Sequence, residues 1–185
     1  MSLGFRGGVN FANAIIEGVS LSPSKRTGMM LGGLIEINIS DAISIQSEVL
    51  YVQKGAEFSV SVGGLSTTTT WKFNYIEFPI LFKEKYGSSS FKPYIFFGPY
   101  LGLRLNAESE VKFGTQSLTL DLKNSTESTD FGLDIGLGGE YSVSEKTALS
   151  GDVRYSAGLS DIDKSSVISW RPTGIQILLG VKFGL

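Results

Sequence analysis

Charged side chains are the groups in this sequence most capable of chemistry, and they recur at one parity of alternating segments. In residues 129–143, Asp134 and Glu140 share even positions with glycines, while most odd positions are apolar. Side chains at every second position of a strand point to the same face. Opposite charges gathered on one face could line an ion path or form a network of ion pairs. The candidate residues are Arg6, Glu36, Glu48, Glu77, Lys83, Arg104, Asp134, Glu140, Asp152, Arg154 and Lys182.

The composition removes most catalytic alternatives. The 185 residues include no Cys and no His, which excludes thiol nucleophiles, disulfides, imidazole ligands and Ser–His pairs. Lysine and arginine number 16 and aspartate and glutamate 18, so the net charge of −2 offers no basic surface for nucleic acid. We therefore expect no catalytic residue, no enzymatic activity and no nucleic-acid partner.

Two further motifs could bind a ligand, but their contexts argue against it. Asp161 and Asp163 are potential calcium ligands, yet the residues around them do not complete an EF-hand-type loop. Residues 136–139 include three glycines, as a phosphate loop does, but they lie inside an expected strand with no helix after it. We expect no metal site and no cofactor.

The elements that position these residues are strands, because apolar residues alternate with period two along most of the chain. A transmembrane helix needs about 20 apolar residues, and the longest apolar stretch, 93–103, is too short. Short connections (40–42, 87–90 and 144–146) alternate with long ones, which is typical of an up-and-down meander. The long connections are 15–26, 59–69, 108–128 and 161–172. The expected strands are 3–14, 27–40, 43–58, 70–86, 91–107, 129–143, 147–160 and 173–184.

Eight strands in this order close into a barrel, whose two faces decide its surroundings. In a soluble, lipocalin-like binder of small ligands, Leu101, Leu103 and Ile135 would line an apolar cavity. In a membrane barrel the same residues face lipid. The polar face carries few charges for a solvated surface and many small residues, which suit a narrow interior. The sequence therefore predicts an all-β, eight-stranded antiparallel up-and-down transmembrane β-barrel, with the soluble binder as the alternative.

With this orientation the candidate charges point into the lumen. Five are basic and six are acidic, so they can neutralise one another. Eight strands leave little room for water inside. We expect a network of ion pairs that plugs the lumen; a narrow ion or solute channel is the alternative.

Prolines and aromatic residues add two expectations. Pro79 and Pro99 fall within expected strands, where each removes a ladder hydrogen bond, so we expect bulges or interrupted pairing there. Aromatic residues near both ends of the strands predict two girdles at the membrane interfaces. These residues are Tyr51, Trp71, Phe73, Tyr155 and Trp170 toward the long loops, and Tyr86, Phe91, Tyr141 and Phe183 toward the short turns.

Several segments together resemble the bacterial outer-membrane β-barrel domain family, which includes PorT-like proteins and the OmpA-like eight-stranded barrels. The resemblance covers nearly the whole chain and implies a barrel without established catalytic residues; PorT-like members are linked to protein secretion. The final Phe183-Gly184-Leu185 departs from the terminal aromatic residue usual in such strands. The segments are Gly4–Asn10, Gln46–Gly55, Tyr75–Lys83, Lys92–Tyr94, Gly98–Tyr100, Gly136–Glu140 and Gly180–Phe183.

We expect residues 1–185 to form one domain, integral to the outer membrane, with both termini periplasmic and the four long loops outside. The first residues, Met1–Gly4, lack the charged and apolar regions of a signal peptide. The expected partners are the lipid bilayer and, through loops 15–26, 59–69, 108–128 and 161–172, other proteins. A monomer with a structural or interaction role is the prediction; a part in secretion is an alternative.

Overall fold

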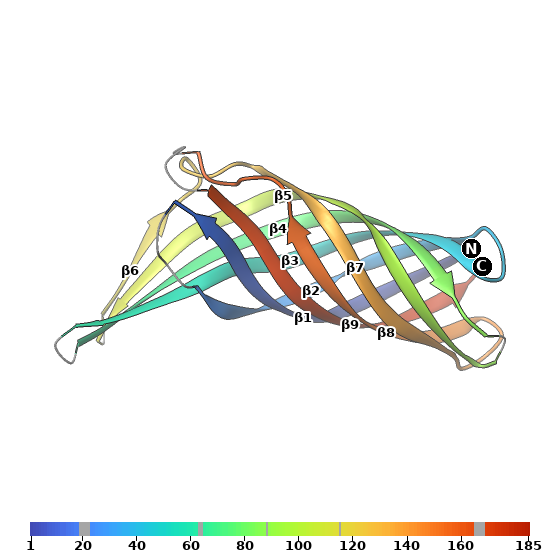
Figure 1. Cartoon of the computed structure of the whole chain (residues 1–185). Helices are drawn as coiled ribbons and strands as arrows, with labels where there is room; N and C mark the ends of the chain where they lie inside the picture. Colours follow the sequence, from blue (N-terminus) through green and yellow to red (C-terminus); the bar gives the residue numbers. More distant parts are fainter. Residues whose placement is uncertain (19–22, 63–64, 88, 115, 165–168) are drawn as a thin grey trace.

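The chain folds into a closed ring of antiparallel strands (Figure 1). The computed structural model describes residues 1–18, 23–62, 65–87, 89–114, 116–164 and 169–185. Within these residues no helix is long and apolar enough to cross a membrane. The strands are β1 (Ser2–Glu17), β2 (Ser24–Asn38), β3 (Ile43–Val62), β4 (Leu65–Lys85), β5 (Phe91–Phe113), β6 (Gln116–Asp121), β7 (Thr129–Ser142), β8 (Thr147–Gly158) and β9 (Ser169–Gly184).

Eight of these strands make the ring, in the order β1-β2-β3-β4-β5-β7-β8-β9, and β9 pairs with β1 to close it. Ser2 lies opposite Gly184, so both termini lie at the same end, which we call the turn end (Figure 1). The long connections lie at the other end, the loop end. The predicted eight-stranded up-and-down barrel is confirmed.

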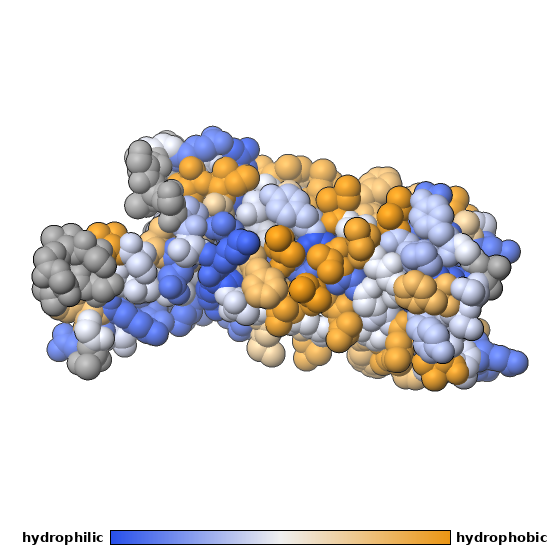
Figure 2. Space-filling view, turned by 60° about the horizontal axis from the view of Figure 1, so that its bottom comes forward, coloured by the Kyte–Doolittle hydropathy of each residue, from blue (hydrophilic) through white to orange (hydrophobic). Residues whose placement is uncertain are grey.

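The two faces of the barrel wall have opposite character. Even positions of β1, β2, β3 and β8 point into the lumen, as the buried Arg6, Glu36, Glu48 and Arg154 illustrate. The odd positions carry exposed apolar side chains, and hydrophobic side chains gather over the barrel in Figure 2. The lumen is not wholly polar, because Met30, Leu50, Val52 and Leu178 pack together inside it.

The strands at the loop end are longer than the sequence predicts. β3 and β4 extend through most of the expected loop 59–69, and β1, β2 and β9 reach into the expected loops 15–26 and 161–172. The expected loop 108–128 contains the end of β5 and an additional strand, β6, that pairs with β5 alone. The expected boundaries of the long loops are therefore wrong, because polar residues on one face of a strand resemble loop residues in sequence.

The longer strands form a sheet that projects beyond the barrel on one side (Figure 1). We call it the projecting sheet; it comprises residues 53–62 of β3, 65–74 of β4, 106–113 of β5, and β6. A register shift between β4 and β5 at Asn74/Tyr75 marks its base. Because β5 has one extra residue there, Leu105, its inward-facing positions change from even to odd.

The two prolines interrupt pairing without shifting the register. Pro79 of β4 pairs with Tyr100, and the next paired residues are Phe82 and Phe97, so Ile80 and Leu81 are skipped. Two residues are skipped on each strand, so the register is the same on both sides of this gap. The expected interruption is present, whereas no bulge accompanies it, because both strands skip the same number of residues.

Candidate functional site

The middle of the lumen holds a tier of five charged side chains, which we call the middle tier. Arg6 of β1 donates hydrogen bonds to Glu48 and Asp152, and Arg154 of β8 lies 3.0 Å from Glu48, 3.3 Å from Asp134 and 3.5 Å from Asp152. All five side chains are almost completely buried. Glu48 is the shared acceptor of both arginines, so it links β1, β3 and β8 across the lumen.

A second tier, the turn-end tier, lies in the lumen near the termini. Glu36 accepts contacts from Lys83 at 3.1 Å, Lys182 at 2.9 Å and Lys85. Lys182 also pairs with Glu140. The Lys83 ammonium lies 3.9 Å from the centroid of the Tyr94 ring, where the ring's negative face adds to its stabilisation.

A third group, the upper tier, lies between the middle tier and the loop end. Lys54 of β3 contacts Glu77 at 2.5 Å and Asp130 at 2.8 Å. The Tyr100 hydroxyl donates to Asp130 at 3.1 Å, and the Lys54 ammonium lies 4.3 Å from the Tyr100 ring centroid. The charge of one buried lysine is therefore matched by two carboxylates and an aromatic ring.

An apolar group lies above the upper tier at the loop end; we call it the mouth cluster. Trp170 of β9 stacks on Trp71 at 4.3 Å and meets Phe73 edge-on at 4.7 Å, and Ile162 is completely buried beside them. Trp170 and Phe73 are 2% and 1% exposed. The full cluster is Ala14, Ala56, Phe73, Tyr75, Ala107, Ile162 and Trp170, with Ile16, Phe58, Trp71 and Leu122 packed against it.

The mouth cluster corrects the expected aromatic girdle at this end. Phe73 and Trp170 point into the lumen, and Trp71 packs on Trp170 instead of forming part of a lipid-facing belt. Tyr155 does lie on the outer surface, as do Tyr86, Phe91, Tyr141 and Phe183 near the turn end. The lumen-facing positions turn apolar at this height, so aromatic residues there pack together inside.

Asp161 holds loop residues at the mouth through two hydrogen bonds. Asp161 accepts hydrogen bonds from the backbone N–H groups of Asp163 and Trp170 at 3.0 and 2.9 Å. Burial raises the pKa of Asp161, but these two N–H groups outweigh it, so the pKa lies below its ordinary value. Asp161 thus stabilises the turn that places Ile162 in the mouth cluster.

Arg104 lies apart from the three tiers. Its guanidinium donates to the backbone carbonyls of Thr126 at 2.7 Å and Lys123 at 3.0 Å. It lies just below the extra residue of β5, at the base of the projecting sheet. Its guanidinium also donates to the Thr126 hydroxyl. The other ten candidate charges all take part in the tiers.

Three charged residues of the tiers were missing from the sequence-based set. Lys54 and Asp130 form most of the upper tier, and Lys85 contributes to the turn-end tier. Each has the parity of a residue already in the set: Lys54 follows Glu48, Asp130 precedes Asp134, and Lys85 follows Lys83. The period-two pattern could have found them, although all three lie toward the ends of their expected strands.

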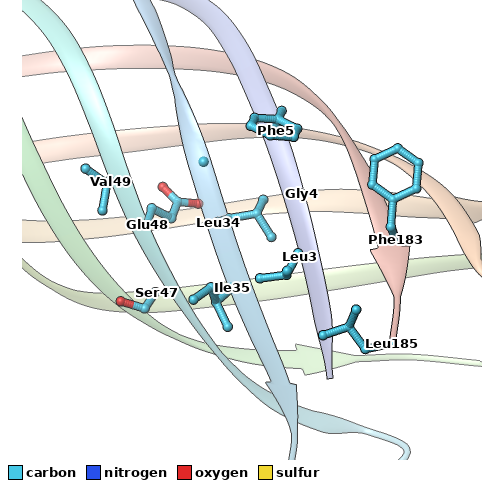
Figure 3. A pocket seen from close by; sticks show the side chains of 11 residues that line it. Leu3, Gly4, Phe5, Leu34, Ile35, Ser47, Glu48, Val49, Phe183 and Leu185 are labelled. Atoms are coloured by element: carbon cyan, nitrogen blue, oxygen red, sulfur yellow. The ribbon is translucent and has the colours of Figure 1, made fainter.

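One hollow of the barrel wall lies outside the lumen, near the turn end. A shallow groove of about 520 Å³ runs over β1, β2, β3 and β9 near the turn end and is bordered by Leu3, Phe5, Ile35, Val49 and Phe183 (Figure 3). These side chains are apolar and face outward. The groove belongs to the apolar outer wall. Glu48 of the middle tier is its one charged lining residue, and this side chain is almost completely buried.

The chemistry open to these tiers is ion pairing. In the described part of the chain, no three His, Cys, Asp or Glu side chains come together as metal ligands. The carboxylates of the tiers are held by cations at short range, and the side chains of the middle tier have almost no exposed surface. Buried charges of this kind are costly unless each is paired. The three tiers together contain six basic and seven acidic side chains, which is close to balance.

Comparison with known proteins agrees with a membrane barrel. Residues 1–164 match the family described as "Outer membrane protein beta-barrel domain". No curated protein sequence matches significantly. The fold resembles Neisserial surface protein A (TM-score 0.54, 16% identity, covering 99% of this chain and 97% of that one) and OprG from Pseudomonas aeruginosa (TM-score 0.57, 12% identity, covering 98% and 94%).

The family fixes the orientation of the wall: the apolar outer face contacts lipid, which overturns the soluble, lipocalin-like alternative. Short turns face the periplasm in such barrels and long loops face outward. Neither the family match nor these neighbours singles out the PorT-like group. The chain belongs to the outer-membrane β-barrel domain family and is an integral protein of the outer membrane.

Proposed function

We propose that this barrel is a non-enzymatic, monomeric outer-membrane protein with a structural or interaction role, and that its lumen is closed to ions and solutes. One observation carries the proposal: three tiers of buried ion pairs and a buried apolar mouth cluster succeed one another along the lumen. A side chain that is paired on several sides cannot move aside without leaving a buried charge unpaired.

The arrangement of the middle tier supports closure rather than conduction. Glu48 of β3 pairs with Arg154 of β8, which lies four strands away around the eight-stranded ring, so this ion pair crosses the lumen. Phe96 lies 5.2 Å from the Arg154 guanidinium and fills space beside it. The alternative function, a narrow channel, would require these pairs to separate.

Conductance in planar lipid bilayers tests the proposal. We expect no steady single-channel steps from the native protein. Glu48→Ala, which removes the shared acceptor, should create a small leak, whereas Glu145→Ala in the exposed turn between β7 and β8 should leave the membrane sealed. Steady steps from the native protein that change in size with Glu48→Ala would overturn the proposal in favour of a channel.

A further inference from the structure

The projecting sheet has two faces whose character is the reverse of the barrel wall below it. Residues directly opposite one another in antiparallel strands share a face. On the lumen side, Phe58 lies opposite Thr69, Val111 opposite Leu118, and Ser109 opposite Leu120. This side also carries Val60, Trp71 and Phe113, and beyond Lys54, at the base of the sheet, the described residues on it include no charged side chain. The other side carries Glu57, Lys72, Glu108, Glu110, Lys112 and Asp121.

Only the base of this apolar face is covered. Phe58 and Trp71 pack against the mouth cluster, where Trp170 and Ile162 lie over them. Farther out, Leu118 and Leu120 remain 59% and 48% exposed, and Val60 and Phe113 are exposed to a similar degree. A hollow of about 540 Å³ lies along Val111, Phe113 and Leu118. The uncovered face thus continues directly from a packed intramolecular interface.

The outer edge of the same sheet is also open. β6 pairs with β5 on one side, and among the described residues no strand pairs with its other side. All six residues of β6 are exposed. Alternate residues of an edge strand direct N–H and C=O groups away from the sheet, which makes the edge a template for another strand. β6 contains none of the lysines or prolines that commonly block such edges.

The charges beside this edge indicate what kind of strand would fit. Glu108 of β5 lies directly opposite Asp121 of β6, and within the described part of the chain neither carboxylate has a salt bridge. Glu110, by contrast, lies 2.7 Å from Lys72 and 3.6 Å from Lys112. Like charges placed directly opposite in a sheet are unfavourable. A lysine or arginine on a neighbouring strand, next to Asp121, would relieve this repulsion.

We propose that β6 binds an extended segment of another protein as an additional strand, and that this segment alternates apolar residues with basic or hydroxyl residues. Its apolar side chains would continue the face of Leu118 and Leu120, and a basic side chain would lie beside Asp121. Strand addition of this kind takes its affinity from main-chain hydrogen bonds and its specificity from alternate side chains. The inference rests on the interaction role proposed above and names its partner class and its place.

A synthetic peptide that alternates valine with lysine and threonine is the probe. It is added to the full-length protein in detergent micelles while amide hydrogen exchange is followed. We expect slower exchange at alternate residues of Ser117–Asp121, and weaker binding of a peptide with the same composition in which all valines come first. Unchanged exchange in β6 with saturating peptide would overturn the proposal.

Charge reversal sharpens the test. Asp121→Lys should weaken binding of the lysine peptide about fivefold and improve binding of the matching glutamate peptide, because an attractive cross-strand pair becomes a repulsive one. Glu145→Lys, at the opposite end of the barrel, is the matched control and should change neither. Equal affinities for Asp121→Lys and the native protein would contradict the proposed position of the strand.

Two other occupants give different results, and both would overturn the proposal. If β6 amides are already protected before peptide is added and the protein is dimeric, a second copy covers the edge. If fatty acid shifts the methyl signals of Leu118 and Leu120 while peptide does not protect β6, the face binds an apolar ligand. Conductance is unaffected by all of these outcomes, so failure here leaves the closed lumen as a separate proposal.

Discussion

The barrel and the projecting sheet are built from the same strands, yet their faces are reversed. Along β3, Val49 faces outward and Glu48 faces the lumen, whereas farther along the same strand Glu57 faces outward and Phe58 faces the lumen side. We interpret the reversal as a change from lipid to water around the strands. One continuous strand can therefore have an apolar outer face in lipid and a polar outer face in water, so the first polar outward residue indicates the edge of the membrane.

The two regions also differ in how their charges are stabilised. In the barrel, charged side chains are buried and depend on each other. On the projecting sheet they are exposed to water, and their pairs, such as Lys72 with Glu110, contribute little to stability. Substitutions of the same kind should therefore have large effects in one region and small effects in the other.

The largest effect is expected at Glu48. Glu48→Ala leaves Arg6 and Arg154 buried without their shared acceptor, although Asp152 still faces both. We expect the free energy of unfolding to fall by about 3–4 kcal/mol, measured by urea titration of the protein in lipid vesicles. Glu110→Ala, the matched change on the projecting sheet, should lower the free energy of unfolding far less, because its ion pair is open to water. Similar losses for both variants would remove the distinction between the regions.

The next largest effect is expected when arginine replaces an apolar residue on the outer wall of the barrel, compared with the same change on the projecting sheet. Ile135 of β7 and Leu118 of β6 are 61% and 59% exposed in the isolated protein, but only Ile135 faces lipid. Ile135→Arg should lower the free energy of unfolding by about 2–3 kcal/mol, because it moves a charge into the bilayer. Leu118→Arg should change it by less than about 0.5 kcal/mol. Unfolding of both variants from the same vesicles makes the comparison, and a large loss for Leu118→Arg would place β6 in the membrane.

This reversal also explains how much the sequence could predict. The inward parity of residues such as Arg6, Glu48 and Arg154 follows from alternation alone, because lipid on one side and a narrow lumen on the other make the two faces distinct. Trp71 and Trp170 stand where the faces exchange character. There an aromatic residue suits either side, so the rule that places aromatics at membrane interfaces predicted the wrong face for them.

Other features required information that a local pattern does not contain. The extra residue at Leu105 changes the inward parity of β5, and nothing in the sequence around it marks the bulge. Ser117–Asp121 does alternate, but this stretch is short and lies between polar residues, so it was assigned to a loop. The partners of Arg104 include the backbone carbonyls of Lys123 and Thr126, which only the folded chain brings near it.

A smaller effect is expected at Arg104, which sequence placed with the lumen charges. Arg104→Ala removes hydrogen bonds to the carbonyls of Thr126 and Lys123 but leaves the three tiers intact. We expect faster amide exchange around residues 122–128 and a loss of about 1–1.5 kcal/mol in the free energy of unfolding. Arg154→Ala is the comparison and should cost at least twice as much. Equal losses would mean that Arg104 takes part in closing the lumen.

The smallest effect is a pH dependence at the boundary between the two regions. The pKa of Asp161 is lowered in the folded protein, so the ionised carboxylate stabilises the turn above the unfolded pKa of about 3.9. This contribution is lost as the pH falls through the folded pKa. The backbone N–H groups of Asp163 and Trp170 then lose a charged acceptor, and Ile162 should loosen from the mouth cluster.

Tryptophan fluorescence between pH 6 and pH 2 should report greater exposure of Trp170 at the acidic end. Asp161→Asn keeps an acceptor oxygen but does not titrate, so it should abolish this part of the change while circular dichroism of the barrel stays constant. A pH profile that is the same in Asp161→Asn would assign the change to the lumen carboxylates instead, and the mouth would then respond to acid together with the barrel rather than independently of it.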